Sequence, residues 1–225
     1  MDSPMTDIHA NLRALDLFCG AGGASMGLHM AGFAVTGVDI NPQPRYPFSF
    51  VQADAMTYPL DGFDFIWASP PCQAHTSLKV LHNARKHTDL IPGTRSRLEA
   101  SCAPWVMENV PGAPLRNPVT LCGSMFQLGV ESAQLRRHRL FEASFKIPPL
   151  KCKHGGPVIG VYGGHQRNRK RSAGKNREAP DFTAEDGRRA MGINWMTLNE
   201  LSQAIPPDYS FYIARHFMFM RRKAA

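Results

Sequence analysis

The chain has 225 residues, of which 43% are hydrophobic and 20% charged, and its formal net charge is +8 at pH 7. This length suits one α/β domain with a small appendage, and we expect no membrane-spanning run, no signal peptide and, from five scattered cysteines, no disulfide framework. The positive charge favours a polyanionic partner, most simply nucleic acid, and the cysteine usage favours a reducing, cytoplasmic compartment.

The first predicted strand, residues 14–18, runs into a glycine-rich turn at 19–23 and a helix over 24–31. This order opens a nucleotide-binding βαβ unit, because glycines let the backbone approach a ligand and the helix start offers free amides. The second predicted strand ends in Asp39, whose carboxylate can accept both hydroxyls of a ribose. A third leads to Asp54, which can accept from an exocyclic amine. Both acids could instead be solvated strand ends.

The apolar run at residues 63–68 predicts a buried strand, which two prolines end, and Cys72 follows them directly. Ligands and reactive groups collect at the carboxyl ends of parallel strands. The prolines stiffen the turn, and a thiolate is an intrinsically strong nucleophile. Cys72 is therefore a candidate nucleophile, with a loop cysteine of no chemical role as the alternative.

The next stretch, after Gln73, is polar and basic and predicts a loop that reaches toward a substrate. A helix is expected over residues 95–102, followed by an apolar strand over 105–111 that carries Glu108. A glutamate at the end of a core strand is costly unless it is used or paired. A salt bridge to a nearby arginine is the structural alternative.

The alternating segment 137–141 predicts a strand with Arg137 and Arg139 on one face. Two adjacent guanidinium groups repel each other, so an anionic or carbonyl-rich group should lie between or above them. A solvated basic edge strand is the alternative.

Residues 143–177 contain no acidic residue, and the polycationic part at 163–177 predicts a loop or disordered arm that contacts phosphates. A solvated segment is the alternative. Cys152 and His154 could form a metal pair, but no second pair stands at zinc spacing, so we expect no metal. Helices are predicted from Thr183 to Met191, over 197–205, and at the end of the chain.

The order of these motifs resembles the cytosine-C5 DNA methyltransferase family over nearly the whole chain. The resemblance rests on Asp-Leu-Phe-Cys-Gly-Ala-Gly-Gly at 16–23, Pro-Pro-Cys-Gln at 70–73, Glu-Asn-Val at 108–110 and the paired arginines. Gln-Ala-Ile-Pro-Pro at 203–207 looks like a loosened form of the family's last motif. So compact a chain looks like a phage or prophage product.

The resemblance implies an α/β, Rossmann-like fold that binds S-adenosylmethionine, with a mostly parallel twisted sheet, helices on both faces and a very small target-recognition insertion. In the family's arrangement Phe18 would stack on the adenine, Asp39 would bind the ribose hydroxyls and Asp54 the adenine amine. The implied cofactor residues are Phe18, Gly20, Ala21, Gly22, Asp39, Ile40, Asp54, Ala55, Pro70, Gln203 and Ala204.

The resemblance also implies methyl transfer to C5 of cytosine in double-stranded DNA, on a base flipped out of the duplex. Cys72 would add to C6, Glu108 would protonate N3, Arg139 would hold O2, and Arg137 would steady the site or a phosphate. The expected DNA contacts are Gln73, Ser77, Lys79, Arg167, Arg169, Lys170, Arg171, Lys175 and Arg177.

We expect a catalytic domain at 1–141, a short basic target-recognition segment at 142–181 and C-terminal helices at 182–225 that complete the catalytic domain. So short a segment implies a recognition sequence of roughly two to four base pairs. The chain departs from the family at Leu135, which replaces a glutamine, and at Gln203, which replaces an asparagine.

Four other functions are compatible with parts of the sequence. A tRNA cytosine methyltransferase shares the catalytic motifs, and an inactive relative would bind S-adenosylmethionine and DNA without methylation. A nicotinamide-dependent dehydrogenase would use the glycine turn and Asp39 but leaves Cys72 unexplained. A DNA-packaging protein would need only the basic segment. We expect a monomer without membrane association.

Overall fold

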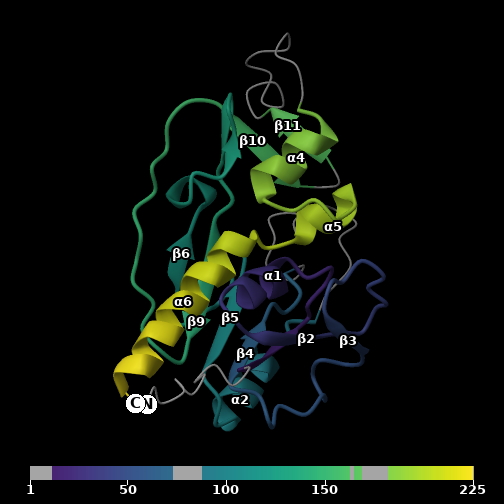
Figure 1. The fold of residues 1–225 in the computed structure, drawn as a ribbon, viewed down its shortest axis with the longest axis vertical. Coiled ribbons are helices and arrows are strands. Elements are labelled where there is room, and N and C mark those ends of the chain that lie inside the picture. Colours follow the sequence, from purple (N-terminus) through teal and green to yellow (C-terminus); the bar gives the residue numbers. More distant parts are fainter. Residues whose placement is uncertain (1–11, 73–87, 163–164, 169–181, 225) are drawn as a thin grey trace, which may run out of the picture.

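The computed structural model describes residues 12–72, 88–162, 165–168 and 182–224. Its centre is a seven-stranded sheet in the order β3-β2-β1-β4-β5-β9-β6 (Figure 1). The parallel strands are β1 (Arg13–Leu17), β2 (Ala34–Asp39), β3 (Ser49–Gln52), β4 (Phe65–Ala68) and β5 (Trp105–Asn109). Strands β9 (Arg139–Ala143) and β6 (Val119–Leu121) extend the sheet with antiparallel pairing.

Helices cover both faces of this sheet, as its continuous apolar strands require. Helices α1 (Gly23–Met30) and α6 (Pro207–Ala224) pack together on one face, and α2 (Ile91–Ala100) lies on the other. In β4, Phe65 and Trp67 join the α1–α6 core, while Ile66 and Ala68 join the α2 core. The predicted α/β, Rossmann-like fold with a mostly parallel sheet and helices on both faces is confirmed.

A smaller sheet, in the order β11-β10-β8-β7, lies beyond one end of the large sheet (Figure 1). Its strands are β7 (Gly129–Val130), β8 (Ala133–Leu135), β10 (Val158–Tyr162) and β11 (His165–Asn168). It packs with α4 (Ala184–Met191) and α5 (Leu198–Gln203) around an apolar core of its own, which includes Leu135 and Ile159. A short 3-10 helix, η2 (Gly123–Met125), precedes β7.

Part of the loop predicted at 163–177 is a strand. Of that range the structure describes residues 165–168, which form β11 and pair antiparallel with β10. Arg167 lies opposite Gly160 in this ladder. The prediction is wrong for these four residues. The backbone of β10 has an open edge, and residues 165–168 form hydrogen bonds with it that do not depend on the type of side chain.

The other predicted elements form with small shifts. Helix α2 begins at Ile91 rather than residue 95, since Pro92 fits the first turn of a helix. Thr183 and Thr197 cap α4 and α5 with reciprocal capping boxes, and Gly192 ends α4 with a positive φ of 67°. In the described residues, no helix has the length and apolar character needed to cross a bilayer.

Candidate active site

A cavity of about 590 Å³ opens at the carboxyl edge of the parallel strands, where ligands of such sheets bind. Segments that follow five strands meet there with the end of α5. The predicted site residues that line it are Phe18, Gly20, Ala21, Asp39, Ile40, Asp54, Ala55, Pro70, Cys72, Glu108, Arg139, Gln203 and Ala204. The fold thus gathers most of both predicted sets, cofactor and catalytic, around one cavity.

The glycine turn after β1 has an unusual backbone. Phe18, Gly20 and Gly22 all have positive φ, of 58°, 48° and 86°. Such a conformation costs a phenylalanine free energy, and strain of this kind concentrates at functional sites. Gly23 is needed for packing, because a Cβ there would lie 2.4 Å from the Ile205 carbonyl oxygen. The turn therefore lies tightly against the C-terminal segment that closes the cavity.

Two predicted carboxylates lie at the cavity wall with their orientation fixed by backbone amides. Asp39 accepts hydrogen bonds from the Gly20 amide (3.1 Å) and the Asn41 amide (2.9 Å). Asp54 accepts one from the Met56 amide at 2.8 Å. Each carboxylate can accept further hydrogen bonds, so both can bind hydroxyl or amine groups of a ligand.

Asp16 is a cavity residue to which the sequence analysis gave no role. Its side chain is 1% exposed, it accepts a hydrogen bond from Ser25, and its Oδ1 has no partner among the described residues. Burial, offset in part by Ser25 and reinforced by the charge of Asp39, raises the pKa of Asp16 to about 7. An acid within an apolar strand was the signal available in the sequence.

The turn that carries Cys72 is fastened to its neighbours. The Asn109 side-chain amide donates to the Pro70 carbonyl at 2.9 Å, and the Ser69 amide donates to the Leu17 carbonyl at 3.1 Å. Cys72 is half-buried at the cavity. Burial and the charge of Glu108 raise the pKa of the Cys72 thiol, against a smaller lowering by nearby arginines.

Glu108 and Arg139 form a buried ion pair beside Cys72. The Arg139 Nε lies 3.1 Å from the Glu108 Oε1, and their side chains are 15% and 7% exposed. Burial raises the pKa of Glu108, and the charges of Arg139 and Arg137 offset this only in part. The salt bridge considered as an alternative for Glu108 therefore exists, and it lies at the cavity.

Arg137 differs from the prediction. Strand β9 begins at Arg139, so the two arginines do not share one face of a strand. The Arg137 guanidinium donates to the Val161 carbonyl (2.7 Å) and the Ser202 carbonyl (2.6 Å), and Tyr209 Oη donates to its carbonyl (2.6 Å). Arg137 does not line the cavity; it joins the smaller sheet to α5, and its charge still lowers the pKa of Cys72. Its predicted catalytic role stays a prediction.

Gly22 also does not line the cavity; it packs against Tyr46, and a Cβ there would lie 3.0 Å from the Tyr46 ring. Most of the predicted DNA contacts lie outside the part of the chain that the structure describes. The contacts that lie outside it are Gln73, Ser77, Lys79, Arg169, Lys170, Arg171, Lys175 and Arg177. Arg167 is placed by its backbone in β11.

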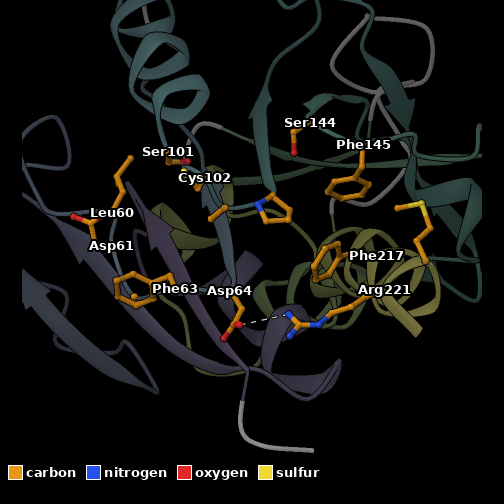
Figure 2. A pocket seen from close by; sticks show the side chains of 14 residues that line it. Leu60, Asp61, Phe63, Asp64, Ser101, Cys102, Ser144, Phe145, Phe217 and Arg221 are labelled. Atoms are coloured by element: carbon orange, nitrogen blue, oxygen red, sulfur yellow. Dashed lines mark hydrogen bonds and ion pairs between the residues drawn. The ribbon is translucent and has the colours of Figure 1, made fainter. Parts of the chain in front are cut away.

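A second cavity, of about 620 Å³, lies at the opposite edge of the large sheet (Figure 2). Asp64 at the start of β4 pairs there with Arg221 of α6 at 3.4 Å, and Phe217 lies beside them. Of the predicted site residues that the structure describes, none lines this second cavity. Most of the described candidates line the cavity at the carboxyl edge instead.

No protein-family model and no curated protein sequence matches the chain. Among solved structures, a candidate DNA modification methyltransferase encoded within an E. coli prophage has a TM-score of 0.62 at 13% identity and covers 94% of this chain and 100% of its own. The S. pombe Dnmt2 methyltransferase has a TM-score of 0.57 at 14% identity, covering 95% and 99%. Spodoptera frugiperda DNMT2 gives 0.56 at 13%, covering 93% and 99%. At these identities the likeness shows a shared fold.

Proposed function

We propose that this protein transfers a methyl group from S-adenosylmethionine to C5 of cytosine in double-stranded DNA, at a short recognition sequence and on a flipped-out base. The observation that carries this proposal is the meeting of Cys72, Glu108 and Arg139 at one cavity with the glycine turn. A nucleophile, a carboxyl group with a raised pKa and a fixed guanidinium are what C5 chemistry on cytosine requires.

The cavity residues fit S-adenosylmethionine, which supplies an electrophilic methyl group on a sulfonium ion. The buried Oδ1 of Asp16, which has no partner among the described residues, suits an ammonium or hydroxyl donor of the ligand. Asp39 suits a ribose diol, and Asp54 an exocyclic amine, since both are fixed acceptors. Phe18 offers an aromatic face at the same cavity.

The residues on the cytosine side would act in sequence. The Cys72 thiolate forms a bond to C6 while Glu108 gives its proton to N3, which makes C5 nucleophilic. C5 would then take the methyl group as the bond between that methyl and the sulfonium sulfur breaks, which leaves a neutral thioether. A base removes the C5 proton, the bond between the Cys72 sulfur and C6 breaks to restore the thiolate, and N3 returns its proton to Glu108. Arg139 would hold O2, because Glu108 fixes its guanidinium at the cavity.

The electrostatics of the site support the roles proposed for Cys72 and Glu108. Burial favours a neutral Cys72 thiol, and the Glu108 charge adds to this. Moving one proton from the Cys72 thiol to the Glu108 carboxylate produces the nucleophilic thiolate and the proton-donating carboxylic acid together, without a proton from solvent. The negative charges of the thiolate and the carboxylate therefore disfavour each other. Arg137 and Arg139 supply positive charge that stabilises the thiolate form.

The test is transfer of labelled methyl from S-adenosylmethionine to unmethylated duplex DNA and, in parallel, to tRNA. We expect labelled DNA with wild type, and loss to background with Cys72→Ser, because a serine hydroxyl is a far weaker nucleophile. Cys102→Ser is the matched control, since this thiol is exposed and lies at the opposite cavity. The control should retain full activity.

The other outcomes would assign other functions. Label in tRNA alone would make the protein an RNA methyltransferase, and cofactor binding with no transfer would make it an inactive binder. Equal activity in wild type and Cys72→Ser would exclude the covalent mechanism. Bisulfite sequencing of the modified DNA tests the short recognition sequence, which a long, strict site would contradict.

A further inference from the structure

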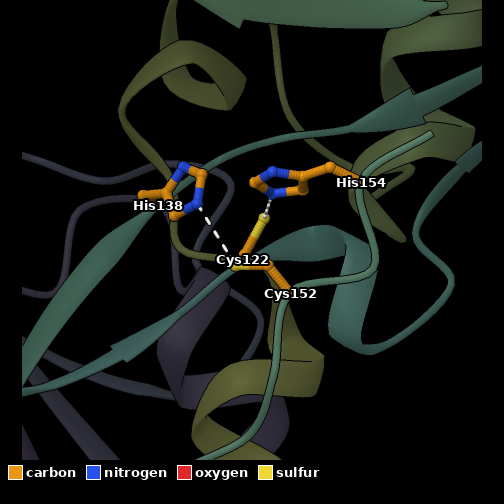
Figure 3. Close-up of side chains that lie close together, drawn as sticks. All are labelled: Cys122, His138, Cys152 and His154. Carbon is orange, nitrogen blue, oxygen red and sulfur yellow. Dashed lines mark hydrogen bonds between the residues drawn. The ribbon is translucent and has the colours of Figure 1, made fainter. Parts of the chain in front are cut away.

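Four potential metal ligands, none of which lines the cavity, gather at one place in the structure (Figure 3). Cys122 follows β6, His138 directly precedes β9, and Cys152 and His154 lie between β9 and β10. Their ligand atoms all lie within 4.8 Å of one another, and the side chains turn toward each other. Three separate segments of the chain thus contribute to one cluster.

The distances within the cluster suit a tetrahedral zinc ion. With bonds of about 2.3 Å to sulfur and 2.0 Å to nitrogen, the corners of such a tetrahedron lie about 3.3 to 3.8 Å apart. The Cys122 sulfur lies 3.4 Å from the His154 Nε2, and the Cys152 sulfur lies 3.5 Å from the His138 Nε2. The two imidazole rings stand at 89° to each other, so each can aim a nitrogen at a shared centre without stacking.

The surroundings fix the ligands as an outer shell of a metal site does. Ser124 Oγ donates to the Cys122 sulfur at 3.3 Å and accepts from the Lys153 amide at 3.2 Å. The Gln134 side chain donates to the Lys153 carbonyl at 3.1 Å and accepts from the Gly155 amide at 3.0 Å. These contacts hold the backbone on both sides of His154, in a segment without regular structure.

We propose that Cys122, His138, Cys152 and His154 bind one zinc ion in a structural Cys₂His₂ site. Four protein ligands leave no open position for substrate, which is typical of structural zinc. Two thiolates balance the charge of the ion, so the site adds no net charge beside the arginines. The exposed side chains of Cys152 and His154 give the ion an entry path.

The zinc ion would stabilise the active site indirectly. His138 lies between Arg137 and Arg139, so a metal bond at His138 fixes the backbone from which both guanidinium groups extend. The same ion would anchor the segment that leads to β10. This proposal revises the sequence-based expectation of no metal and does not depend on the methyltransferase proposal.

The first test is the zinc content of the purified 225-residue chain, free of any affinity tag, by elemental mass spectrometry. We expect about one zinc per chain in the wild type and in Cys102→Ser, the matched control outside the cluster. Cys152→Ser and His154→Ala should lose the metal. Both substituted side chains are exposed, so folding should persist, and circular dichroism would check it.

Cobalt substitution tests the geometry. The wild type loaded with Co²⁺ should show the intense visible bands of tetrahedral coordination and a thiolate charge-transfer band, both absent in Cys152→Ser. His154→Cys keeps four ligands and should keep the metal. A chelator should lower the melting temperature of the wild type by several degrees and leave Cys152→Ser unchanged.

Three results would overturn the proposal. The first is a folded, metal-free wild type, purified from zinc-containing medium, with five titratable thiols. The second is a mass that shows a disulfide between Cys122 and Cys152 in place of metal. The third is full zinc retention in folded Cys152→Ser.

Discussion

Two buried arginine–glutamate pairs share strand β9, and they differ in how completely the carboxylate is bound. Glu142 accepts from Arg95 Nε (2.7 Å), Arg95 Nη2 (2.8 Å) and the Arg116 amide (2.7 Å). Glu108 has one ion-pair contact to Arg139, at 3.1 Å, and a hydrogen bond with the Ser69 side chain, and it lines the cavity. Both glutamates are nearly inaccessible to solvent, at 4% and 5% exposed, but Glu108 lies deeper in the protein.

The pKa values of the two glutamates are shifted in opposite directions. Burial alone would raise the pKa of Glu142, but the hydrogen bonds from Arg95 and Arg116 hold it below its ordinary value. For Glu108 burial prevails, and the pKa is raised despite two arginine charges. A glutamate is thus kept ionised where several donors converge on it, and is able to carry a proton where fewer donors reach it and burial is deeper. The first pair stabilises the fold, and the second is available for chemistry.

The largest expected effect comes from removing the carboxylate of the Glu108–Arg139 pair at the cavity. Glu108→Gln should lower methyl transfer by about 10² to 10⁴-fold, because an amide can donate a hydrogen bond to cytosine N3 but cannot give it a proton. Single-turnover transfer of labelled methyl measures this loss. Glu99→Gln, at an exposed pair with Arg116, is the matched control and should be fully active. A wild-type rate in Glu108→Gln would remove Glu108 from the chemistry.

The second prediction concerns the removal of the carboxylate from the Arg95–Glu142 pair. Glu142→Gln should lower the free energy of unfolding by about 3–5 kcal/mol, because it leaves the Arg95 guanidinium buried without a counter-charge. Urea denaturation measures this change, and the transfer rate per folded molecule should stay near that of the wild type. The double variant Arg95→Met, Glu142→Leu should recover most of the loss, since no charge is then buried.

The pH dependence of this second effect has a definite sign. The folded pKa of Glu142 lies below the unfolded one, so its contribution is fully present above the unfolded pKa and is lost as pH falls through the folded pKa. The difference in the free energy of unfolding between the wild type and Glu142→Gln should therefore become smaller toward acid pH. A gap that is constant with pH would show that the pair acts through packing alone.

The smallest expected effect is a shift in the titration of Cys72. The Glu108 charge raises the pKa of this thiol, so Glu108→Gln should move the pH profile of Cys72 alkylation to lower pH. Iodoacetamide labelling followed by peptide mass spectrometry measures it at this one cysteine. Glu142→Gln should leave the profile unchanged, because Glu142 is not among the groups that perturb Cys72. Equal shifts in both variants would contradict this assignment.

Much of the large sheet was predictable from local pattern. The apolar run before Pro70, the glycine turn after β1 and the threonine caps of α4 and α5 are short-range signals, and each structure formed where it was expected. Strand β11 was missed because its polar sequence gives no apolar alternation; it forms because its pairing with β10 satisfies backbone hydrogen bonds. The predicted division at residues 142 and 181 stays a prediction; the smaller sheet takes strands from both sides of residue 142.

By itself, the sequence determined the elements that bring Cys72, Glu108 and the strand-end acids to one edge, because parallel strands separated by helices all end on the same side. Only the tertiary structure decided which groups became partners. The register of β9 against β5 brings Glu108 beside Arg139, so that the two form an ion pair. Two carbonyl groups from segments distant in the chain accept hydrogen bonds from Arg137. The metal-ligand cluster arose in the same way, from residues whose spacing matches no local zinc motif. Partnership between distant side chains depends on packing, which local pattern does not encode.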